Sequence, residues 1–295
     1  MGSRIPARSS FVSPHLNGCK PAHFGSAVMT VLPLASDAQE GPQAFSACDV
    51  EIPFPKSWRG AFGGVVEDRF VRLRFAGAAN GPPVLVLGGI SANRFVADEC
   101  AGRGWWSAVA RQRGGVDTER FCVIGADFFP QDPASPVALC PADYADVLAY
   151  ALAAAGVSRL HAIVGASFGG AIALAFARRH AERVGRIAVL CAADRPSAMS
   201  SAWRAVQAGV IEFAEKHGDG AAGVALARQL AMTTYRTPEE FAERFSSRAE
   251  VRGYLDARGE DYAARVSPAR YITLSAAIDR ADEAPHEIDA PALFV

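Results

Sequence analysis

The sequence predicts an α/β protein with a mostly parallel sheet, and three observations carry that prediction. Short apolar runs of strand length recur at residues 84–87, 121–127, 160–164 and 185–193. Helix-like segments separate the later runs, and this alternation favours right-handed crossovers and a parallel sheet covered on both faces. The third observation is a strand, sharp turn and helix at residues 159–177, RLHAIVGASFGGAIALAFA, around which the rest of the chain is organised.

Composition is that of a globular chain. Of 295 residues, 50% are hydrophobic and 21% are charged, which allows one large domain with an insertion or two small domains. The 30 Lys and Arg against 31 Asp and Glu give a net charge of −1, so nothing favours a nucleic-acid partner. No apolar run approaches the roughly 20 residues that span a bilayer, so no membrane partner is predicted.

The six cysteines predict neither disulfides nor a metal site. They form no C-x-x-C pair and have no histidine at metal-ligand spacing: Cys19, Cys48, Cys100, Cys122, Cys140 and Cys191. In a chain of this length we expect reduced thiols, hence a cytoplasmic protein, with Cys122 and Cys191 buried in strands.

The N-terminal part of the chain precedes the predicted core. Residues 1–45 are rich in Ser, Pro, Gly and Ala and lack periodicity, so a flexible N-terminal extension is predicted; a transit peptide is the alternative. The α/β core is predicted over residues 46–194. Within it, residues 69–75 alternate, with Val71 and Leu73 on one face and Arg74 on the other, which predicts a half-exposed antiparallel strand near the sheet edge.

Further core elements follow in order. Residues 84–87 predict a buried strand that runs into Gly88-Gly89-Ile90-Ser91, where glycines let backbone N–H groups face a ligand. The tandem Trp of residues 102–106, GRGWW, indicates core packing before a short helix. Residues 121–127 predict a buried strand, and residues 142–155 predict a helix that Gly156 closes.

Residues 165–169, Gly-Ala-Ser-Phe-Gly, match the G-x-S-x-G nucleophile elbow, which requires a strand before it and a helix after it. The glycines leave room where strand and helix nearly touch, so that a strained Ser167 can be held there. Ser167 is therefore the predicted nucleophile, and the N–H groups that begin the helix suit an oxyanion. The alternative is a small-residue turn in which Ser167 merely caps a helix.

This pattern is typical of the α/β-hydrolase fold. There the oxyanion hole uses the N–H of the residue after the nucleophile and a second N–H from the loop after an earlier strand. Phe168 and Ile90 are the predicted donors. For Ile90, an ordinary core residue is an equally good interpretation.

After residue 194 the strand pattern stops. Apolar residues recur at helical spacing, which predicts an inserted helical lid over residues 195–285: Trp203, Val206, Val210 and Phe213 show this spacing first. APALFV at residues 290–295 then predicts that segment 286–295 starts the returning core strand.

Several motifs make the chain resemble the MetX-type homoserine O-acyltransferases over about residues 60–295. They are LGGIS at 87–91, GRGWW at 102–106, VDTERFCVIG at 116–125, VGASFGG at the elbow, WRAVQ at 203–207 and LARQLAMTTYR at 226–236. GRGWW and AWRAVQ look most like the homoserine O-succinyltransferases of proteobacteria.

The resemblance implies a two-step acyl transfer in methionine biosynthesis. Ser167 would attack the thioester of an acyl-CoA, with succinyl-CoA favoured, and the hydroxyl of L-homoserine would then take the acyl group. Acyl-CoA is thus a co-substrate, and no cofactor is bound permanently. Arg228 would hold the carboxylate of homoserine with Tyr235 beside it, and Arg236 is the second choice. Without the resemblance, Arg228 and Tyr235 are a solvated lid arginine and a core tyrosine.

The resemblance also implies a homodimer through the lid helices. The chain departs from the family pattern in two places. Phe168, often Met in the family, is expected to narrow the acyl pocket while its N–H stays available. The triad Asp and the terminal Gly-His-Asp segment would lie beyond Val295, so the C-terminal strand and helix are expected to be missing. A serine without a base is a weak nucleophile at neutral pH.

Residues in the chain are poor substitutes for these partners. Asp194 ends a strand where some hydrolase-fold enzymes have their acid, whereas His286 lies in an acidic connector and is interpreted as a surface histidine. His161 begins the nucleophile strand, His180 ends its helix and His217 lies in the lid. The alternatives are therefore a homoserine or serine O-acetyltransferase, a serine hydrolase or esterase, and a catalytically dead truncated homologue.

Overall fold

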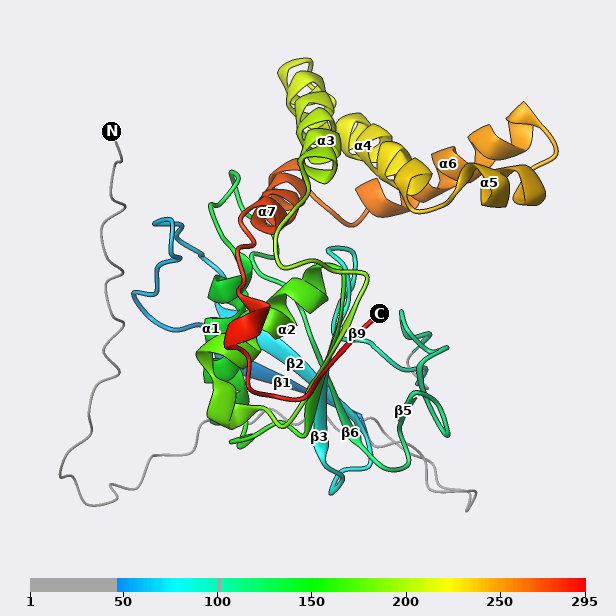
Figure 1. Cartoon of the computed structure of the whole chain (residues 1–295). Coiled ribbons are helices and arrows are strands. Elements are labelled where there is room, and N and C mark those ends of the chain that lie inside the picture. The colour runs from blue at the N-terminus through cyan, green and yellow to red at the C-terminus, as the bar shows by residue number, and fades with distance from the viewer. Residues whose placement is uncertain (1–46, 100–101) are drawn as a thin grey trace, which may run out of the picture. The chain divides into compact units, whose positions relative to one another are not determined.

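The computed structural model in Figure 1 describes residues 47–99 and 102–295. The predicted extension at residues 1–45 lies outside the described residues, as do Cys19 and Cys100. Seven strands form one sheet in the order β1-β2-β6-β3-β7-β8-β9. Their bounds are β1 (Cys48–Pro53), β2 (Phe70–Gly77), β3 (Pro83–Leu87), β6 (Cys122–Ala126), β7 (Ala162–Ala166), β8 (Ile187–Leu190) and β9 (Ala292–Phe294).

The sheet is mostly parallel, as predicted. β1 pairs antiparallel with β2, and β2 pairs antiparallel with β6. From β6 through β3, β7, β8 and β9 every pairing is parallel. Parallel strands end at a common edge, so the segments that leave β3, β6, β7 and β8 gather there. The turn after β7 carries Ser167.

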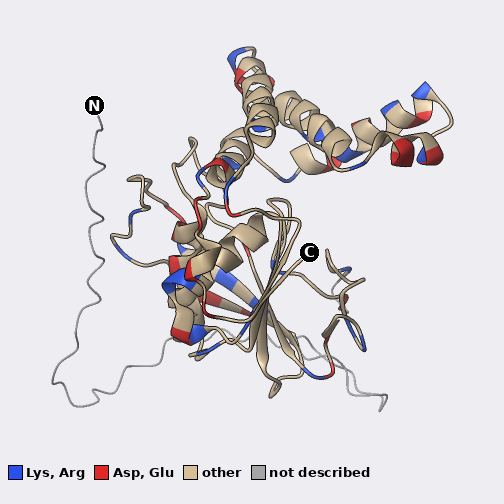
Figure 2. Cartoon of the chain, viewed as in Figure 1, with Lys and Arg blue, Asp and Glu red and all other residues tan. Residues whose placement is uncertain are grey.

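The predicted exposure of one face of β2 is wrong at Arg74. This side chain is only 5% exposed, because Asp49 of β1 and Glu99 cover it. The guanidinium donates to Asp49 Oδ1 at 2.8 Å and to Glu99 Oε2 at 2.9 Å. The charged segments of the sheet lie in β1 and β2 (Figure 2). In a strand of alternating polar and apolar residues, a charged side chain is predicted to be exposed, because its ion-pair partners are distant in sequence.

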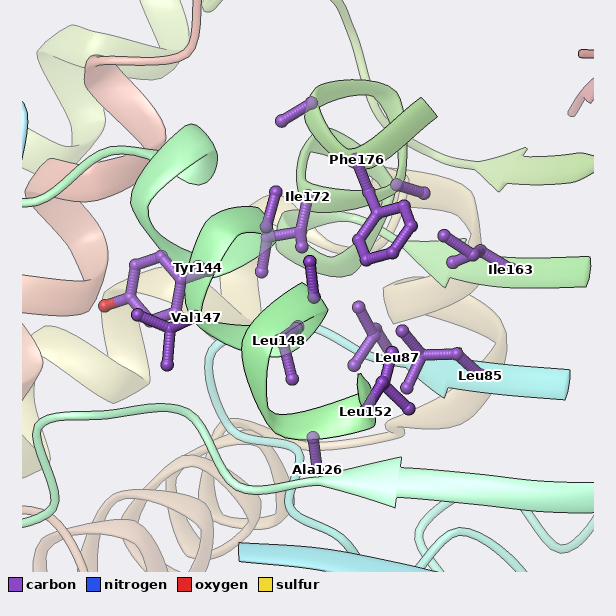
Figure 3. Packing of buried hydrophobic residues seen from close by; sticks show 14 of the residues in the cluster. Leu85, Leu87, Ala126, Tyr144, Val147, Leu148, Leu152, Ile163, Ile172 and Phe176 are labelled. Carbon is purple, nitrogen blue, oxygen red and sulfur yellow. The ribbon is translucent and has the colours of Figure 1, made fainter. Parts of the chain in front are cut away.

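Two helices cover one face of the sheet. α1 (Pro141–Ala154) and α2 (Phe168–Arg179) are joined by β7, and both pack on the main core. Figure 3 shows α1 and α2 side chains meeting those of the strands: Tyr144, Leu148 and Leu152 from α1, Ile172 and Phe176 from α2, Leu85 and Leu87 from β3, and Ile163 from β7. Burial of apolar surface at this layer boundary is the main term that stabilises the fold.

The segment between β8 and β9 is helical. It contains α3 (Ala198–Lys216), α4 (Gly220–Thr234), α5 (Pro238–Arg244), α6 (Arg248–Ala263) and α7 (Pro268–Asp279). A separate apolar cluster holds these helices together, with Ile211, Val224, Ala227, Tyr262 and Tyr271 at its centre. We refer to α3–α7 as the lid.

The helix α7 joins the lid to the core. Its residues Leu274 and Ala277 belong to the main core cluster. Thr273 Oγ1 accepts a hydrogen bond from Val137 N–H at 2.9 Å, and the buried Arg270 guanidinium donates to the carbonyl of Pro130. The lid therefore has a fixed point of attachment beside the loop that precedes α1.

The tandem Trp packs as predicted, but the element after it differs. Trp105 and Trp106 stack at 5.1 Å and pack on a cluster that includes Val84 and Val86 of β3. In place of the predicted short helix, a turn leads to β4 (Ala110–Arg111), which pairs with β5 (Val116–Asp117). A run of only a few residues before Gly114 and Gly115 is too short to sustain a helix.

The described cysteines are free thiols, as predicted, although one location is wrong. Cys48, Cys122, Cys140 and Cys191 form no disulfide. Cys122 is buried in β6, but Cys191 is exposed and follows β8 in a left-handed conformation with φ of 49°. The strand ends at Leu190, before this turn of the chain. Among the described residues no helix is both long and apolar enough to cross a membrane.

Acid is expected to destabilise the fold through Asp49. Burial alone would raise the pKa of Asp49, but hydrogen bonds from Arg94 and Arg74 outweigh it, so the pKa is lowered. A lowered pKa means that the unfolded chain binds more protons, so the stabilisation is complete above about pH 4 and is lost as pH falls through the folded pKa. Asp49→Asn should lower Tm at pH 7 and flatten the decline of Tm below pH 4.

Thermal unfolding between pH 2.5 and pH 7 tests this expectation. The control is Asp261→Asn on α6. This substitution removes an exposed ion pair with Arg265 and should change Tm little. Parallel pH profiles for wild type and Asp49→Asn would contradict the assignment.

Candidate functional site

Ser167 lies between β7 and α2 in a strained conformation. Its φ is 53° and its ψ is −119°, a combination that L-residues rarely adopt. Neighbouring glycines are required for steric reasons: a Cβ on Gly165 would lie 2.3 Å from Gly169 O, and a Cβ on Gly169 would lie 2.4 Å from Leu87 O. The side chain of Ser167 is exposed. The turn thus has the strand, elbow and helix geometry that the sequence predicts.

The first turn of α2 supplies backbone N–H groups beside Ser167. In the first turn of α2, Gly169 N–H donates to Gly88 O at 2.8 Å, and Gly170 N–H and Ala171 N–H donate to Ser167 O. Within the described residues this leaves the N–H of Phe168 without an acceptor, as expected at the start of a helix. That N–H is a suitable oxyanion donor beside Ser167.

The loop after β3 passes beside the serine. A Cβ added to Gly89 would lie 3.9 Å from Ser167 Oγ. The N–H of Ala92 closes a turn on Gly89 O at 2.8 Å, and Ile90 is the second residue of that turn. The Ile90 side chain packs partly buried against the main core, so both interpretations of this residue agree with its surroundings. Phe168 and Ile90 remain the predicted oxyanion donors.

The Phe168 ring does not occupy the position expected from the sequence. The ring is buried in the core, where it packs edge-on against Phe128 at 5.1 Å and Tyr144 at 5.0 Å. A ring that points under α2 cannot also narrow a pocket above Ser167. The expected narrowing of the acyl pocket is therefore wrong, and Phe168 anchors the elbow to the core instead.

A cluster of ion pairs fixes the loop beside Ser167, and the sequence analysis missed it. The backbone N–H and the guanidinium of Arg94 donate to Asp127, at 2.9 and 2.8 Å. The guanidinium also donates to Asp49 at 3.0 Å, and Asp49 in turn accepts from Arg74. The loop that leaves β3 is thus tied to β1, β2 and the end of β6. The only sequence feature that could have indicated this cluster is Asp127, an acidic residue at the end of a predicted strand.

The described histidines lie away from Ser167. His161 precedes β7, whose five residues span about 17 Å. His180 follows the 12 residues of α2, about 18 Å from its start, and hydrogen-bonds with Asp146 at 3.0 Å. His217 ends α3 and hydrogen-bonds with Phe213 O. His286 is exposed, and Glu287 beside it lies 4.0 Å from Arg178 near the end of α2.

Asp194 pairs with an arginine rather than with a histidine. Its carboxylate accepts from Arg195 at 3.3 Å, and its carbonyl accepts from Glu283 N–H at 2.9 Å. Within residues 47–99 and 102–295, no histidine or acid has a hydrogen bond to Ser167 Oγ. The described part of the chain therefore contains the elbow and the two predicted oxyanion donors, and it places no histidine or acid as a base on Ser167.

Arg228 and Tyr235 come together in the lid. Arg228 lies on α4, and its guanidinium carbon is 5.6 Å from the ring of Tyr235, the residue that ends this helix. Tyr235 is 60% exposed, so it is not a core tyrosine. Arg236, the second choice, lies in the connection to α5. Sequence reasoning missed a third member, Tyr262 of α6, whose ring lies 4.8 Å from the same guanidinium.

Arg228 has no counter-ion in the part of the chain that the structure describes. Among the described residues it has no ion pair within 4.0 Å, and its Nε is buried with no hydrogen-bond partner. A guanidinium between two aromatic rings, with its charge unused, is a ready receptor for a carboxylate. In the described ranges, no three His, Cys, Asp or Glu side chains come together as a group that could hold a metal ion.

Known proteins resemble this chain in sequence. A homoserine O-succinyltransferase from Xanthomonas campestris pv. campestris is 38% identical over 245 residues, which are 77% of this chain and 64% of that protein. A homoserine O-acetyltransferase from Leifsonia xyli subsp. xyli is 30% identical over 219 residues, 61% of this chain and 54% of that protein. The chain thus spans between about half and two thirds of the length of these two relatives.

The fold has close counterparts among solved structures. A homoserine O-acetyltransferase from Staphylococcus aureus superposes with a TM-score of 0.69 at 21% identity, over 85% of this chain and 79% of that one. The family model described as alpha/beta hydrolase fold matches residues 82–294. That match runs from β3 through the elbow and the lid to β9, and the chain belongs to the alpha/beta hydrolase fold family.

Proposed function

We propose that the protein transfers an acyl group from an acyl-CoA to the side-chain hydroxyl of L-homoserine, in methionine biosynthesis. The observation that carries this proposal is the uncompensated Arg228 in the lid of a chain that also has a serine elbow. A carboxylate receptor in the lid suits an acceptor that is an amino acid, whereas water needs no receptor of this kind. The names of the two curated relatives support the same reaction.

Succinyl-CoA is the proposed donor, because the relative at 38% identity is named an O-succinyltransferase and the one at 30% an O-acetyltransferase. Acyl-CoA acts as a co-substrate, and the proposal includes no permanently bound cofactor. We also propose a cytoplasmic location, where acyl-CoA and homoserine are found together.

The mechanism follows from the residues around the elbow. Ser167 Oγ attacks the thioester carbon, and the resulting oxyanion receives hydrogen bonds from the N–H groups of Phe168 and Ile90. Collapse of this intermediate releases CoA and leaves an ester on Ser167. The hydroxyl of homoserine then attacks that ester while Arg228 holds its carboxylate. Each attack requires a base that takes the proton of the attacking hydroxyl and returns it to the leaving group, the CoA sulfur in the first step and Ser167 Oγ in the second. No histidine or acid among the described residues is hydrogen-bonded to Ser167 for this role.

Release of CoA tests the proposal directly. Succinyl-CoA and acetyl-CoA are incubated with the full chain, with L-homoserine, with L-serine and without an acceptor. Homoserine-dependent release with one donor supports the transfer and identifies that donor. Release of equal rate without any acceptor would indicate a hydrolase, and no release from either donor would overturn the proposed activity for this chain. Ser167→Ala is the negative control.

A homodimer through the lid helices is a further part of the proposal. α3 carries an exposed apolar stripe whose side chains are between 42% and 66% exposed: Met199, Trp203, Val206 and Phe213. The spacing predicted a helix here without saying which face is buried; α3 buries Gln207 and Ile211 and leaves the stripe outside. An apolar stripe of this kind is typical of a partner surface.

Val206→Glu is expected to convert the dimer to a monomer, because a charge at the centre of an apolar interface is left unpaired. Light scattering after gel filtration at micromolar concentration measures the mass. Glu212→Gln, on a different face of the same helix, should leave the dimer intact. A wild-type chain that is monomeric under these conditions would overturn this part of the proposal.

A further inference from the structure

We infer that Tyr262 is a positioning residue, whose ring orients the guanidinium of Arg228 to receive a carboxylate without neutralising its charge. The inference rests on the proposed function for the identity of the ligand. The contacts that support it are present in the free protein, so they can be tested separately from the reaction.

The guanidinium of Arg228 lies between two rings. Its central carbon is 4.8 Å from the ring centroid of Tyr262 and 5.6 Å from that of Tyr235. Attraction between a cation and an aromatic face is worth about 0.5–2 kcal/mol, and it favours a guanidinium stacked against the ring. The ring of Tyr262 is the closer of the two and is buried, whereas Tyr235 is exposed at the end of α4.

Tyr262 is held rigidly in turn. It is 2% exposed and packs edge-on against Tyr271, with 5.9 Å between the ring centroids. The hydroxyl of Tyr271 donates to Gln207 Oε1 at 2.9 Å, which links the pair to α3. Three lid helices, α3, α6 and α7, therefore support the surface on which Arg228 rests. A rigid support of this kind reduces the rotamer entropy that binding would otherwise cost.

The chemistry at position 262 explains why an aromatic residue stands there. An acidic residue would also hold the guanidinium, but it would pair with the charge that a substrate carboxylate needs. Burial, opposed by the nearby Arg228, raises the pKa of Tyr262 to about 12, so the ring stays neutral at physiological pH. The hydroxyl itself has no hydrogen-bond partner among the described residues, so the ring face is the part in use.

Two substitutions separate the ring from the hydroxyl. Tyr262→Phe keeps the ring and removes an unpaired buried hydroxyl, so Tm should stay equal or rise, and the Kd for L-homoserine should stay within twofold. Tyr262→Leu removes the ring and should weaken binding about tenfold, or 1.4 kcal/mol. Calorimetry with the full chain measures both values. The control is Tyr254→Leu, also on α6, whose ring contacts Arg244 and Arg258 and not Arg228.

A second readout needs no ligand. The Nε–H of Arg228 is buried, so its ¹⁵N-resolved NMR signal should exchange slowly with water and carry a ring-current shift from Tyr262. Arg228→Lys identifies the signal by its loss. We expect the shift to persist in Tyr262→Phe and to collapse in Tyr262→Leu.

The outcomes distinguish the two ideas. An unchanged Arg228 signal in folded Tyr262→Leu would overturn the positioning role. Loss of homoserine binding in Tyr262→Phe would overturn it as well, because the hydroxyl would then be the contact, and this variant decides the matter if Tyr262→Leu does not fold. No homoserine binding by wild type, with the signal still dependent on the ring, would refute the proposed substrate and leave the positioning role standing.

Discussion

Gly169→Ala is expected to lower the free energy of unfolding by about 3 kcal/mol, at the upper end of the cost of overpacking. The added Cβ would lie 2.4 Å from Leu87 O, 2.5 Å from Leu87 C and 2.6 Å from Leu87 Cβ. These atoms belong to β3, which is hydrogen-bonded to strands on both sides, so neither the strand nor α2 can move away cheaply. Urea denaturation followed by circular dichroism measures the change.

The same substitution should also damage the site. Gly169 N–H donates to Gly88 O, the contact that joins the first turn of α2 to the loop beside Ser167. A helix pushed outward would lengthen this hydrogen bond and separate the proposed donors Phe168 and Ile90. Any residual activity of Gly169→Ala should therefore fall more than its folded fraction does.

Gly209→Ala is the matched control. Gly209 lies in the exposed middle of α3, where an added Cβ meets nothing within 4 Å. Because Ala is the better helix former, this variant should gain about 0.5–1 kcal/mol. If Gly169→Ala and Gly209→Ala lowered the free energy of unfolding equally, steric crowding at the elbow would not explain why position 169 is a glycine.

The elbow could be predicted from the sequence because its determinants are local. A buried strand, two glycines around Ser167 and a small-residue helix all lie within residues 159–177, and each carries its own steric requirement. The mostly parallel sheet could be predicted for a similar reason, since alternating strands and helices admit few connections. Periodicity also indicated helices between β8 and β9, although it did not show which face of α3 is buried.

The residues that sequence reasoning misjudged depend on distant partners. Arg74 alternates like an exposed residue, but Asp49 and Glu99 bury it. Phe168 looked like a pocket residue until Phe128 and Tyr144 were seen around it. No local sequence pattern marks Tyr262, because its proposed role depends on contact with Arg228, which lies on another helix. Side-chain pairing across elements is set by tertiary packing, which a single sequence does not display.

Arg228→Gln is expected to reduce kcat/KM for homoserine at least 100-fold, which corresponds to about 2.7 kcal/mol. A neutral amide keeps much of the length of the side chain and loses the paired, charge-assisted hydrogen bonds that a guanidinium makes with a carboxylate. The loss should appear mainly in KM. The first half-reaction, release of CoA as Ser167 is acylated, should proceed at the wild-type rate, because the acyl donor does not need this receptor.

Arg236→Gln is the control that the chain itself offers. It removes the same charge from the end of the same motif, LARQLAMTTYR, but Arg236 lies in the connection to α5, and the guanidinium over the rings of Tyr235 and Tyr262 is that of Arg228. Its kcat/KM should stay within twofold of wild type. If the two effects were reversed, Arg236 would be the carboxylate receptor, and the orienting role of Tyr262 would lose its purpose. If both variants were silent in turnover and in the Kd for homoserine, the amino-acid substrate itself would have to be abandoned, because an uncompensated arginine in the lid is the feature on which its recognition rests.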